Sequence, residues 1–497
     1  MGLQQYTGNC NDDIPLKLTA AGDKPFFEEM DIFLKLDRLM PTATGVDGIP
    51  AWFLRLMAPF LALPIAGLFN LSIRNSIVPN QWKAACIIPV PKIANPAKAS
   101  DFRPISIVPV LSRIMERMIV RKFIYPSLDC LPHPLSVMDQ HAFRPSGSTT
   151  SAIISVISDI SAMLRENSYV RVLALDFSKA FDTLRHSSLM NKYALLSLPD
   201  EVYNWLANYF QGRTHCTRVG GEFSTFRKIS AGVIQGSVPG PASYVVAASD
   251  LAPRYQANKM EKYADDTYLI IPSSSASTTD EELSHIGNWA SCNNLRLNNA
   301  KSNEVIFTRP RRGRAGDRAD PPPPVQGITR VSQLSILEVE ISNNLSVSMH
   351  VDNLIKSCAQ SLYALRTLRA HGLPDGPLHK IFASTTLAKI MYASSAWSGF
   401  ASAEDKNRLD AFSRKSKRLG YCDPGAPSVS ELMAKYDAHL FKNVKCNPRH
   451  VLYRALPPLK NSTYNLRKRS HSFCIPSSDG PDFKKNFISR MLLVGAY

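Results

Sequence analysis

The sequence predicts an α+β protein that folds as several packed units. Its 497 residues exceed what a single hydrophobic core can hold. Short β-rich apolar runs occupy the middle of the chain, at residues 170–177, 262–271 and 303–309. Apolar residues at helical spacing then dominate residues 351–418. Strands followed by a long helical stretch are typical of the α+β class.

The N-terminal part is predicted to be helical after an irregular start at residues 1–25. Apolar residues recur at helical spacing over 26–39, and a Gly-containing loop at 42–50 precedes a second helix from Ala51. The apolar stretch 56–73 contains two prolines and an asparagine and barely reaches the length of a membrane span. It is therefore predicted to be a buried helix or pair of helices.

Prolines and cap residues mark the next elements. Residues 86–92 (CIIPVPK) are β-rich but interrupted by prolines, so they are predicted to form an edge strand that leads into a loop. Residues 101–120 are predicted to begin as a loop and to become a helix near Leu111. Ser148 is a candidate N-cap for a helix over 148–165.

The same signals predict the remaining elements. Helices are expected at 189–210, 243–257 and 280–294, and a hairpin at 218–232 with its turn at Gly220-Gly221. Residues 309–324 are basic and then proline-only, which predicts a disordered or extended surface loop. A short hairpin is expected between this loop and the helical segment.

The charge indicates a partner rather than a fold. The formal net charge is +17, and residues 401–497 hold 18 Lys and Arg against 8 Asp and Glu, a net charge of +10. Phosphate backbones are the partners that such an excess attracts. A region that grips nucleic acid is therefore expected here, and a merely solvated basic tail is the alternative.

Cysteine usage and the first residues indicate an intracellular protein. The nine cysteines are scattered and none forms a C-x-x-C pair, which excludes a zinc knuckle or a redox dithiol of that spacing. Such a set fits reduced thiols better than a disulfide framework. The N-terminus lacks the basic start and apolar run of a secretory signal, and Tyr6 breaks the myristoylation pattern.

Three aspartates are placed where they can bind metal ions. Asp176 ends an apolar run, and Asp265 and Asp266 lie between two apolar β runs. Neighbouring residues of a straight strand point to opposite faces, so adjacent aspartates converge only at a turn such as a strand–DD–strand hairpin. Two ions about 3.5–4 Å apart, held by few carboxylates, catalyse in-line displacement at phosphorus. Taken alone, Asp265-Asp266 is better explained as a polar turn, because such turns are common.

The surrounding segments make the pattern specific. LDFSKAFDTLRH (175–186), GVIQGSVPGP (232–241), YADD (263–266) and WASCNNLRLNNAKSNEVIF (289–307) resemble motifs A to D of the reverse transcriptases of non-LTR (LINE-like) retrotransposons. Upstream, VDGIP, WKAACIIPVPK, DFRPIS and QHAFRPSGSTT resemble the finger segments of that family. YNLRKRSHSFCIP and KKNFISRML resemble the tails of some family members. The segments follow the family order from about residue 26 to 492.

The resemblance implies a right-hand polymerase with fingers, an antiparallel palm sheet and a helical thumb. Fingers and palm would occupy residues 26–308, the basic and proline-rich loop 309–327, the primer-grip hairpin and thumb 328–420, and a basic C-terminal region 421–497. The implied reaction is RNA-directed DNA synthesis from dNTPs with two Mg²⁺ or Mn²⁺ ions. The implied partners are an RNA template and a DNA primer or target, with no membrane, and the protein would act in the nucleus.

The resemblance also assigns roles at the metal site and beneath the sugar. Asp176 and Asp265 would bind both metal ions, helped by the backbone carbonyl of Phe177, and Asp266 would be an accessory carboxylate. Phe181 would pack under the sugar of the incoming nucleotide and exclude ribonucleotides. The alternative for Phe181 is a core aromatic beneath the helix after motif A.

Five further residues would bind the nucleotide. Gln235 and Gly236 would lie along the template and incoming base, where glycine permits close backbone approach. Arg103 and Lys92 resemble the finger cations that grip the triphosphate, and Lys301 resembles the motif D lysine that protonates pyrophosphate. For each cation, the alternative is a solvated surface charge.

The sequence also departs from the family pattern. After motif B, Ala248 and Ser249 replace larger or amide residues, and the L-G-V turn of the primer-grip hairpin reads Leu337-Glu338-Val339. Glu338 brings a negative charge near primer phosphates, which is expected to lower activity. No endonuclease or zinc-knuckle segment is recognised, which favours a truncated element copy.

Two other functions remain open. A decayed copy that binds nucleic acid without extending it is favoured by Glu338 and disfavoured by the intact aspartates. An intron maturase is disfavoured by the non-LTR-like spacing around YADD.

Overall fold

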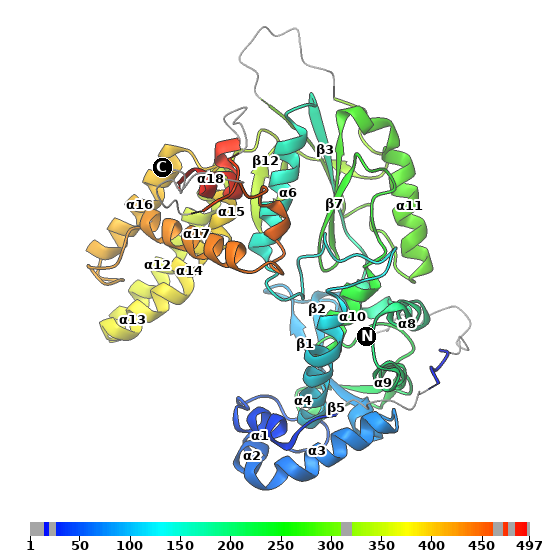
Figure 1. Ribbon diagram of the computed structural model, residues 1–497. Coiled ribbons are helices and arrows are strands. Elements are labelled where there is room, and N and C mark those ends of the chain that lie inside the picture. Colours follow the sequence, from blue (N-terminus) through cyan, green and yellow to red (C-terminus); the bar gives the residue numbers. More distant parts are fainter. Residues whose placement is uncertain (1–13, 19–25, 310–320, 461–470, 476–482, 495–497) are drawn as a thin grey trace. The chain divides into compact units, whose positions relative to one another are not determined.

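The computed structural model describes residues 14–18, 26–309, 321–460, 471–475 and 483–494 (Figure 1). The chain forms two compact units, each assembled from three stretches of sequence. Unit 1 comprises Met1–Val137, Phe177–Ala252 and Ser284–Leu297. Unit 2 comprises Met138–Asp176, Pro253–Leu283 and Asn298–Tyr497. Most of the predicted 309–324 loop lies outside the described residues.

Three helices near the start of unit 1 confirm the first helical predictions: α1 (Glu29–Asp37), α2 (Ala51–Leu56) and α3 (Ala58–Arg74). The asparagine within the apolar stretch has a structural use, because buried Asn70 bonds the backbone N–H and C=O of Phe27 at 2.7 and 2.9 Å. This pair ties α3 to the segment that leads into α1.

The prediction that residues 56–73 are buried is wrong for one side of α3. Phe69 and Ile73 are fully buried, whereas Phe60 and Leu63 are 75% and 64% exposed. Apolar composition around the whole helix predicted burial, but the fold covers only one face. Within the described ranges, the chain has no helix with the length and apolar character needed to cross a bilayer.

Unit 1 contains a sheet in the order β2-β1-β4-β5, with β6 also paired to β4. Its strands are β1 (Ala84–Pro91), β2 (Phe102–Ile107), β4 (Thr214–Val219), β5 (Glu222–Phe223) and β6 (Arg227–Lys228). The β4–β5 connection confirms the predicted hairpin, because Gly220 and Gly221 occupy its turn with φ of +60° and +94°.

Two strand predictions in this sheet need correction. The segment predicted as an edge strand is β1, which pairs with β2 on one side and β4 on the other. Its prolines are tolerated because pairing with β4 covers only Ala84 to Ile87, before Pro89 and Pro91. The predicted loop after residue 101 is β2, whose Pro104 lies opposite Pro89.

The remaining helices of unit 1 are α4 (Val110–Ile119), η3 (Val120–Ile124), α5 (Tyr125–Ser127), α7 (Ala180–Thr183), α8 (His186–Leu195), α9 (Asp200–Phe210) and α10 (Pro239–Ala247), with short turns η1 (Asn80–Lys83) and η2 (Ala99–Asp101). The helix predicted at 243–257 is wrong in extent. Helix α10 begins earlier because Pro239 suits the first helical turn, and it ends before Asp250 bonds Lys192 and Trp289.

Unit 2 contains the second sheet, in the order β10-β9-β3-β8-β7. Its strands are β3 (Tyr169–Leu175), β7 (Lys259–Tyr263), β8 (Asp266–Pro272), β9 (Asn303–Thr308) and β10 (Thr329–Arg330). The three predicted strand regions are confirmed, and β3 pairs antiparallel with both β8 and β9. Helix α6 (Thr149–Met163), capped by Ser148 as predicted, packs on β7 and β8.

The rest of unit 2 is a hairpin followed by helices. The hairpin is β11 (Gln333–Ile336) and β12 (Val339–Ser342). The helices are α12 (Ser348–Ala370), α13 (Asp375–Phe382), η5 (Ala383–Leu387), α14 (Ala388–Met391), α15 (Ser394–Trp397), α16 (Ala403–Arg418), α17 (Val429–Cys446), η6 (Tyr453–Ala455), η7 (Phe483–Lys485) and α18 (Phe487–Val494). Helix α11 (Thr279–Cys292), preceded by η4 (Ser273–Thr278), runs from unit 2 into unit 1. The structure confirms the predicted short hairpin, the predicted helical segment at 351–418 and the predicted helix at 280–294.

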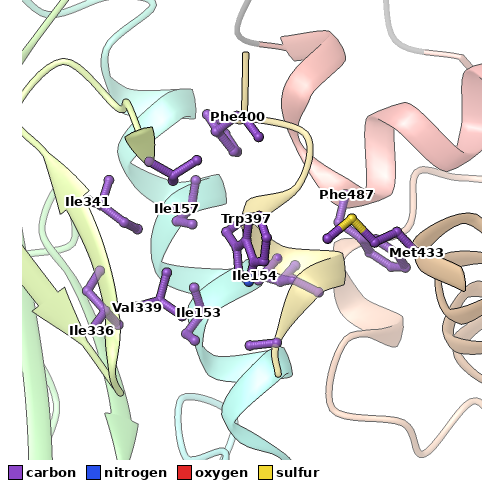
Figure 2. Packing of buried hydrophobic residues seen from close by; sticks show 14 of the residues in the cluster. Ile153, Ile154, Ile157, Ile336, Val339, Ile341, Trp397, Phe400, Met433 and Phe487 are labelled. Atoms are coloured by element: carbon purple, nitrogen blue, oxygen red, sulfur yellow. The ribbon is translucent and has the colours of Figure 1, made fainter. Parts of the chain in front are cut away.

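One hydrophobic core joins the sheet, the hairpin and the C-terminal helices of unit 2 (Figure 2). Ile153 and Ile157 of α6 face the β11–β12 hairpin, and Ile154 lies beside Trp397 of α15. Phe487 of α18 belongs to the same core. The basic C-terminal region therefore contains structural helices and is not only a solvated tail.

The β11–β12 turn places two residues in the left-handed region, Leu337 at φ +48° and Glu338 at φ +69°. A side chain there costs roughly 1 kcal/mol, which glycine avoids. Tyr392 Oη donates a hydrogen bond to the Leu337 carbonyl at 3.1 Å and helps to hold the turn. Glycine suits this turn because it adopts a positive φ without strain, whereas Glu338 adopts the same φ at a cost.

We expect Glu338→Gly to stabilise the protein by about 1 kcal/mol. Stability is measured by thermal melting. Glu338→Ala is the matched control, because it removes the charge but keeps the backbone strain. If Ala raises the melting temperature as much as Gly does, backbone strain at this turn is not the cause.

Candidate active site

Strand register places the three predicted aspartates together in unit 2. Leu175, the last residue of β3, pairs with Thr267 of β8. Asp176 follows Leu175 in the chain and Asp266 precedes Thr267, so the two aspartates come next to each other in this register. Tyr263 pairs with Asp266 across the turn, which leaves Ala264 and Asp265 at its tip. The hairpin thus presents both aspartates beside Asp176, as the sequence predicted for a turn.

Electrostatics confirms that the carboxylates crowd one another. Burial, followed by the negative charge of Asp176, raises the pKa of Asp265 above its ordinary value. Asp266 reaches the surface. Desolvation of its carboxyl group is the largest cause that raises its pKa to about 6, and the negative charges of Asp265 and Asp176 add to the shift. Carboxylates that repel each other at neutral pH are poised to accept a cation.

Asp176 is held by neighbours that the sequence did not identify. Asn298 Nδ2 donates to Asp176 Oδ2 at 3.0 Å, and the Asn298 N–H donates to the Asp176 carbonyl at 2.8 Å. Ser302 Oγ accepts from the Asp176 N–H at 3.2 Å. Both residues lie in the motif D resemblance, which is the only sequence signal that could have found them.

The donor set suits a hard divalent cation. Mg²⁺ prefers oxygen ligands, uses few protein carboxylates, and completes its shell with water and substrate phosphates. In the part of the chain that the structure describes, no three His, Cys, Asp or Glu side chains enclose a point where an ion could be held. The three aspartates supply only oxygen donors, which are the ligands that Mg²⁺ prefers.

Unit 1 brings together the predicted nucleotide-binding residues of motifs A and B. The Phe181 carbonyl accepts from the Val233 N–H at 2.7 Å, and Gln235 Nε2 donates to Asp182 Oδ1 at 2.8 Å. Burial raises the pKa of Asp182, which Gln235 and nearby Lys92 counteract. Asp182, which accepts the hydrogen bond from Gln235, was not among the site residues predicted from the sequence.

The backbone conformation and the close packing at Gly236 both require glycine. Its φ is +107°, and a Cβ at this position would lie 2.5 Å from the Ser106 carbonyl oxygen. The Ser106 N–H in turn donates to the Gln235 carbonyl at 2.7 Å. The close approach occurs against β2 of unit 1. A contact of Gly236 with template or base remains a prediction.

Phe181 stacks on Tyr244 of α10, with ring centroids 4.7 Å apart and an interplanar angle of 18°. Tyr244 is buried, whereas Phe181 is half-buried. One face of the Phe181 ring is therefore supported by the protein. Phe177, next to Asp176 in the chain, is buried in unit 1 with its ring 5.8 Å from that of Trp289.

The predicted cations lie at the surface of their units. Arg103 is exposed on β2 opposite Val90, and Lys92 is exposed one residue beyond β1, where its Nζ donates to the Ser100 carbonyl at 3.0 Å. Both lie at the end of the β1–β2 pair where residues 92–101 connect the two strands. Lys301 is exposed in unit 2, in the turn between Asn298 and Ser302.

Part of the chain is similar to known proteins. Residues 90–338, half of the chain, match the family model described as reverse transcriptase (RNA-dependent DNA polymerase). A probable RNA-directed DNA polymerase from transposon BS of Drosophila melanogaster is 26% identical over 75% of this chain and 42% of its own length. The polymerase from mobile element jockey of the same species is 30% identical over 53% of this chain and 30% of its own length.

The similarities cover only part of these relatives, so the chain spans less than half of their length. A solved telomerase from Candida tropicalis, in complex with a TWJ fragment of telomeric RNA, aligns with a TM-score of 0.41 at 13% identity. The alignment covers 69% of this chain and 56% of that one.

Proposed function

The chain belongs to the reverse transcriptase family, and we propose that it has a right-hand polymerase fold and catalyses RNA-directed DNA synthesis for a non-LTR retrotransposon. The observation that carries the proposal is the group of three aspartates at the β3–β8 junction, where strand pairing brings Asp176 beside Asp266 and the hairpin turn adds Asp265. Neighbouring carboxylates repel one another, and a bound cation would relieve that repulsion.

In this proposal each site residue has a separate task. Asp176 and Asp265, with the Phe177 carbonyl, hold two Mg²⁺ or Mn²⁺ ions, and Asp266 is the accessory carboxylate. Bound ions of this kind lower the pKa of an attacking hydroxyl and stabilise charge on leaving phosphate oxygens.

The other residues act on the substrates. Arg103 and Lys92 bind the triphosphate, Lys301 protonates the departing pyrophosphate, and Gln235 and Gly236 position the base pair. Phe181, supported by Tyr244, lies under the sugar. An RNA template, a DNA primer or target and dNTPs are the substrates and partners, and the nucleus is the place of action.

Primer extension tests the proposal directly. Purified protein is incubated with poly(rA)/oligo(dT), dTTP and Mg²⁺ or Mn²⁺, and the products are resolved by length. We expect extension that depends on the divalent ion and on the RNA template. Retention of the duplex in a mobility-shift assay without extension would instead support a decayed copy that only binds nucleic acid.

The C-terminal region is proposed to bind the phosphate backbone through the exposed face of α17. Lys435 and Lys442 lie two turns apart on that helix, and both are exposed. Deleting the region would remove Phe487 and other core residues of unit 2, so single charges are the better probe. The basic run at 467–469 lies outside the described residues.

We expect the double variant Lys435→Gln/Lys442→Gln to flatten the slope of log K against log salt by up to about 2, since each phosphate contact contributes about 0.9 for duplex DNA. Binding is measured by fluorescence anisotropy with a labelled duplex at several salt concentrations. Arg55→Gln/Arg74→Gln, two exposed charges of α2 and α3, is the matched control. Equal slopes for the Lys double variant and the parent would exclude this face from backbone contact.

A further inference from the structure

We propose that Gln140 is a positioning residue that holds the turn carrying Asp265 in the shape needed for metal binding. The inference rests on the proposed function, because it assigns Asp265 to the metal ions. Gln140 is 1% exposed and lies in unit 2, close to the hairpin but far from it in sequence. It does not itself reach the reacting atoms, and it acts through the backbone of Ala264.

The contacts of Gln140 converge on one residue of the turn. Its Oε1 accepts from the Ala264 N–H at 2.9 Å, and its Nε2 donates to the Ala264 carbonyl at 3.4 Å. Both backbone groups of Ala264 are therefore bonded by a single side-chain amide. Oε1 also accepts from the Ala142 N–H at 3.0 Å, which fixes the amide plane.

Ala264 is a residue whose backbone needs such support. Its φ is +57°, in the left-handed region that an alanine disfavours, and its side chain is buried. The buried N–H and C=O of Ala264 need hydrogen-bond partners within the protein. The Gln140 amide supplies both partners and so favours the left-handed shape over an ordinary turn. Asp265 follows directly, so the conformation of Ala264 sets its direction.

The segment that carries Gln140 is itself anchored to the hairpin. The Lys262 N–H donates to the Asp139 carbonyl at 2.7 Å, and the His141 N–H donates to the Lys262 carbonyl at 2.9 Å. Lys262 Nζ also pairs with Asp139 Oδ2 at 3.0 Å. Gln140 therefore sits in a short parallel bridge beside β7, with little freedom to move away from the turn.

The test compares Gln140→Leu with a matched control, Asn258→Leu. Asn258 is a buried amide at the other end of β7, bonded to Glu282 Oε1 at 2.8 Å and Thr278 Oγ1 at 3.0 Å, and it makes no bond to the turn. Both substitutions remove a buried amide of unit 2. Thermal melting of the full chain reports the structural cost of each.

Two readouts separate positioning from stability. The first is steady-state primer extension on poly(rA)/oligo(dT), where we expect Gln140→Leu to lower kcat about 10²-fold, as small misplacements of catalytic groups do, with little change in the KM for the duplex. The second is Mn²⁺ binding to the protein by electron paramagnetic resonance, without substrate, where we expect weaker binding. Asn258→Leu should lower the melting temperature and leave both readouts near parental.

A second substitution tests the proposed cause. Ala264→Gly removes the left-handed penalty, so the turn should depend less on Gln140. We expect Gln140→Leu to cost clearly less activity and Mn²⁺ affinity in the Ala264→Gly background than in the parent. If Gln140→Leu does not fold, Gln140→Asn, whose shorter amide cannot bond both groups, takes its place with a smaller loss in the same direction.

The outcomes distinguish this inference from the proposed function. If the parent binds Mn²⁺ but does not extend primers, the proposed polymerase activity is contradicted. The Mn²⁺ affinities of the parent and the Gln140→Leu variant then decide whether Gln140 positions the turn. A parent that extends primers, with a Gln140→Leu variant that matches it in kcat and Mn²⁺ binding, overturns the inference. Losses that equal those of Asn258→Leu, or that Ala264→Gly does not reduce, also overturn it.

Discussion

An Asp265→Asn variant is expected to lose at least about 10³-fold in primer-extension rate while keeping its fold, because a lost ligand forfeits several kcal/mol of transition-state stabilisation. Asn keeps the shape of the side chain but cannot supply a negative charge. The pKa of Asp265 is raised in the folded protein, so its ionised form lowers stability at neutral pH. The metal-free variant should therefore melt at or above the parental temperature.

Extension rate and thermal melting are measured together at neutral pH. Asp280→Asn is the control, since Asp280 is an exposed carboxylate at the start of α11 in the same unit. It should retain parental activity. Near-parental extension by Asp265→Asn would remove Asp265 from the metal site, and a lowered melting temperature with lost activity would point to a folding role instead.

A Phe181→Val variant is expected to gain on the order of 10²-fold in relative use of ribonucleotides. A site that leaves a 2′-hydroxyl both clashing and unpaired rejects it by several kcal/mol, and a smaller side chain removes the clash. The stacked Tyr244 keeps the Phe181 ring in place, which is what a steric gate requires. The measurement is the ratio of kcat/KM for dGTP and GTP on one primer–template.

Phe123→Val is the matched control for lost packing. Phe123 is another half-buried phenylalanine of unit 1, with its ring 6.3 Å from that of Phe27. It should lose stability and leave the sugar preference unchanged. If Phe181→Val behaves in the same way, Phe181 is a packing residue and not a gate.

Local signals in the sequence were enough for the elements that carry chemistry. The apolar runs on either side of Asp265-Asp266 predicted the β7–β8 hairpin, because adjacent aspartates converge only where two strands reverse. Ser148 predicted the start of α6, because its side chain bonds the first turn, here the Ser151 N–H at 3.1 Å. Such features depend on residues a few positions apart, so they can be predicted from the sequence.

Features that depend on distant residues escaped prediction. Residues 102–107 were predicted to be part of a loop, and only the pairing of β2 with β1 explains why they form a strand. The exposed face of α3 could not be foreseen, since composition does not say which neighbours arrive. Asn298 and Gln140 are ordinary polar residues until the fold brings them to Asp176 and Ala264.

The shared core of unit 2 also has a consequence during protein synthesis. Helix α6 and strand β3 leave the ribosome early, but Ile154 of α6 lies beside Trp397, and Trp397 and Phe487 of the same core are made much later. At ordinary elongation rates the wait is on the order of half a minute. Over that interval an isoleucine-rich helix and unpaired strand edges stay open to other chains, which makes the nascent protein a natural client of chaperones.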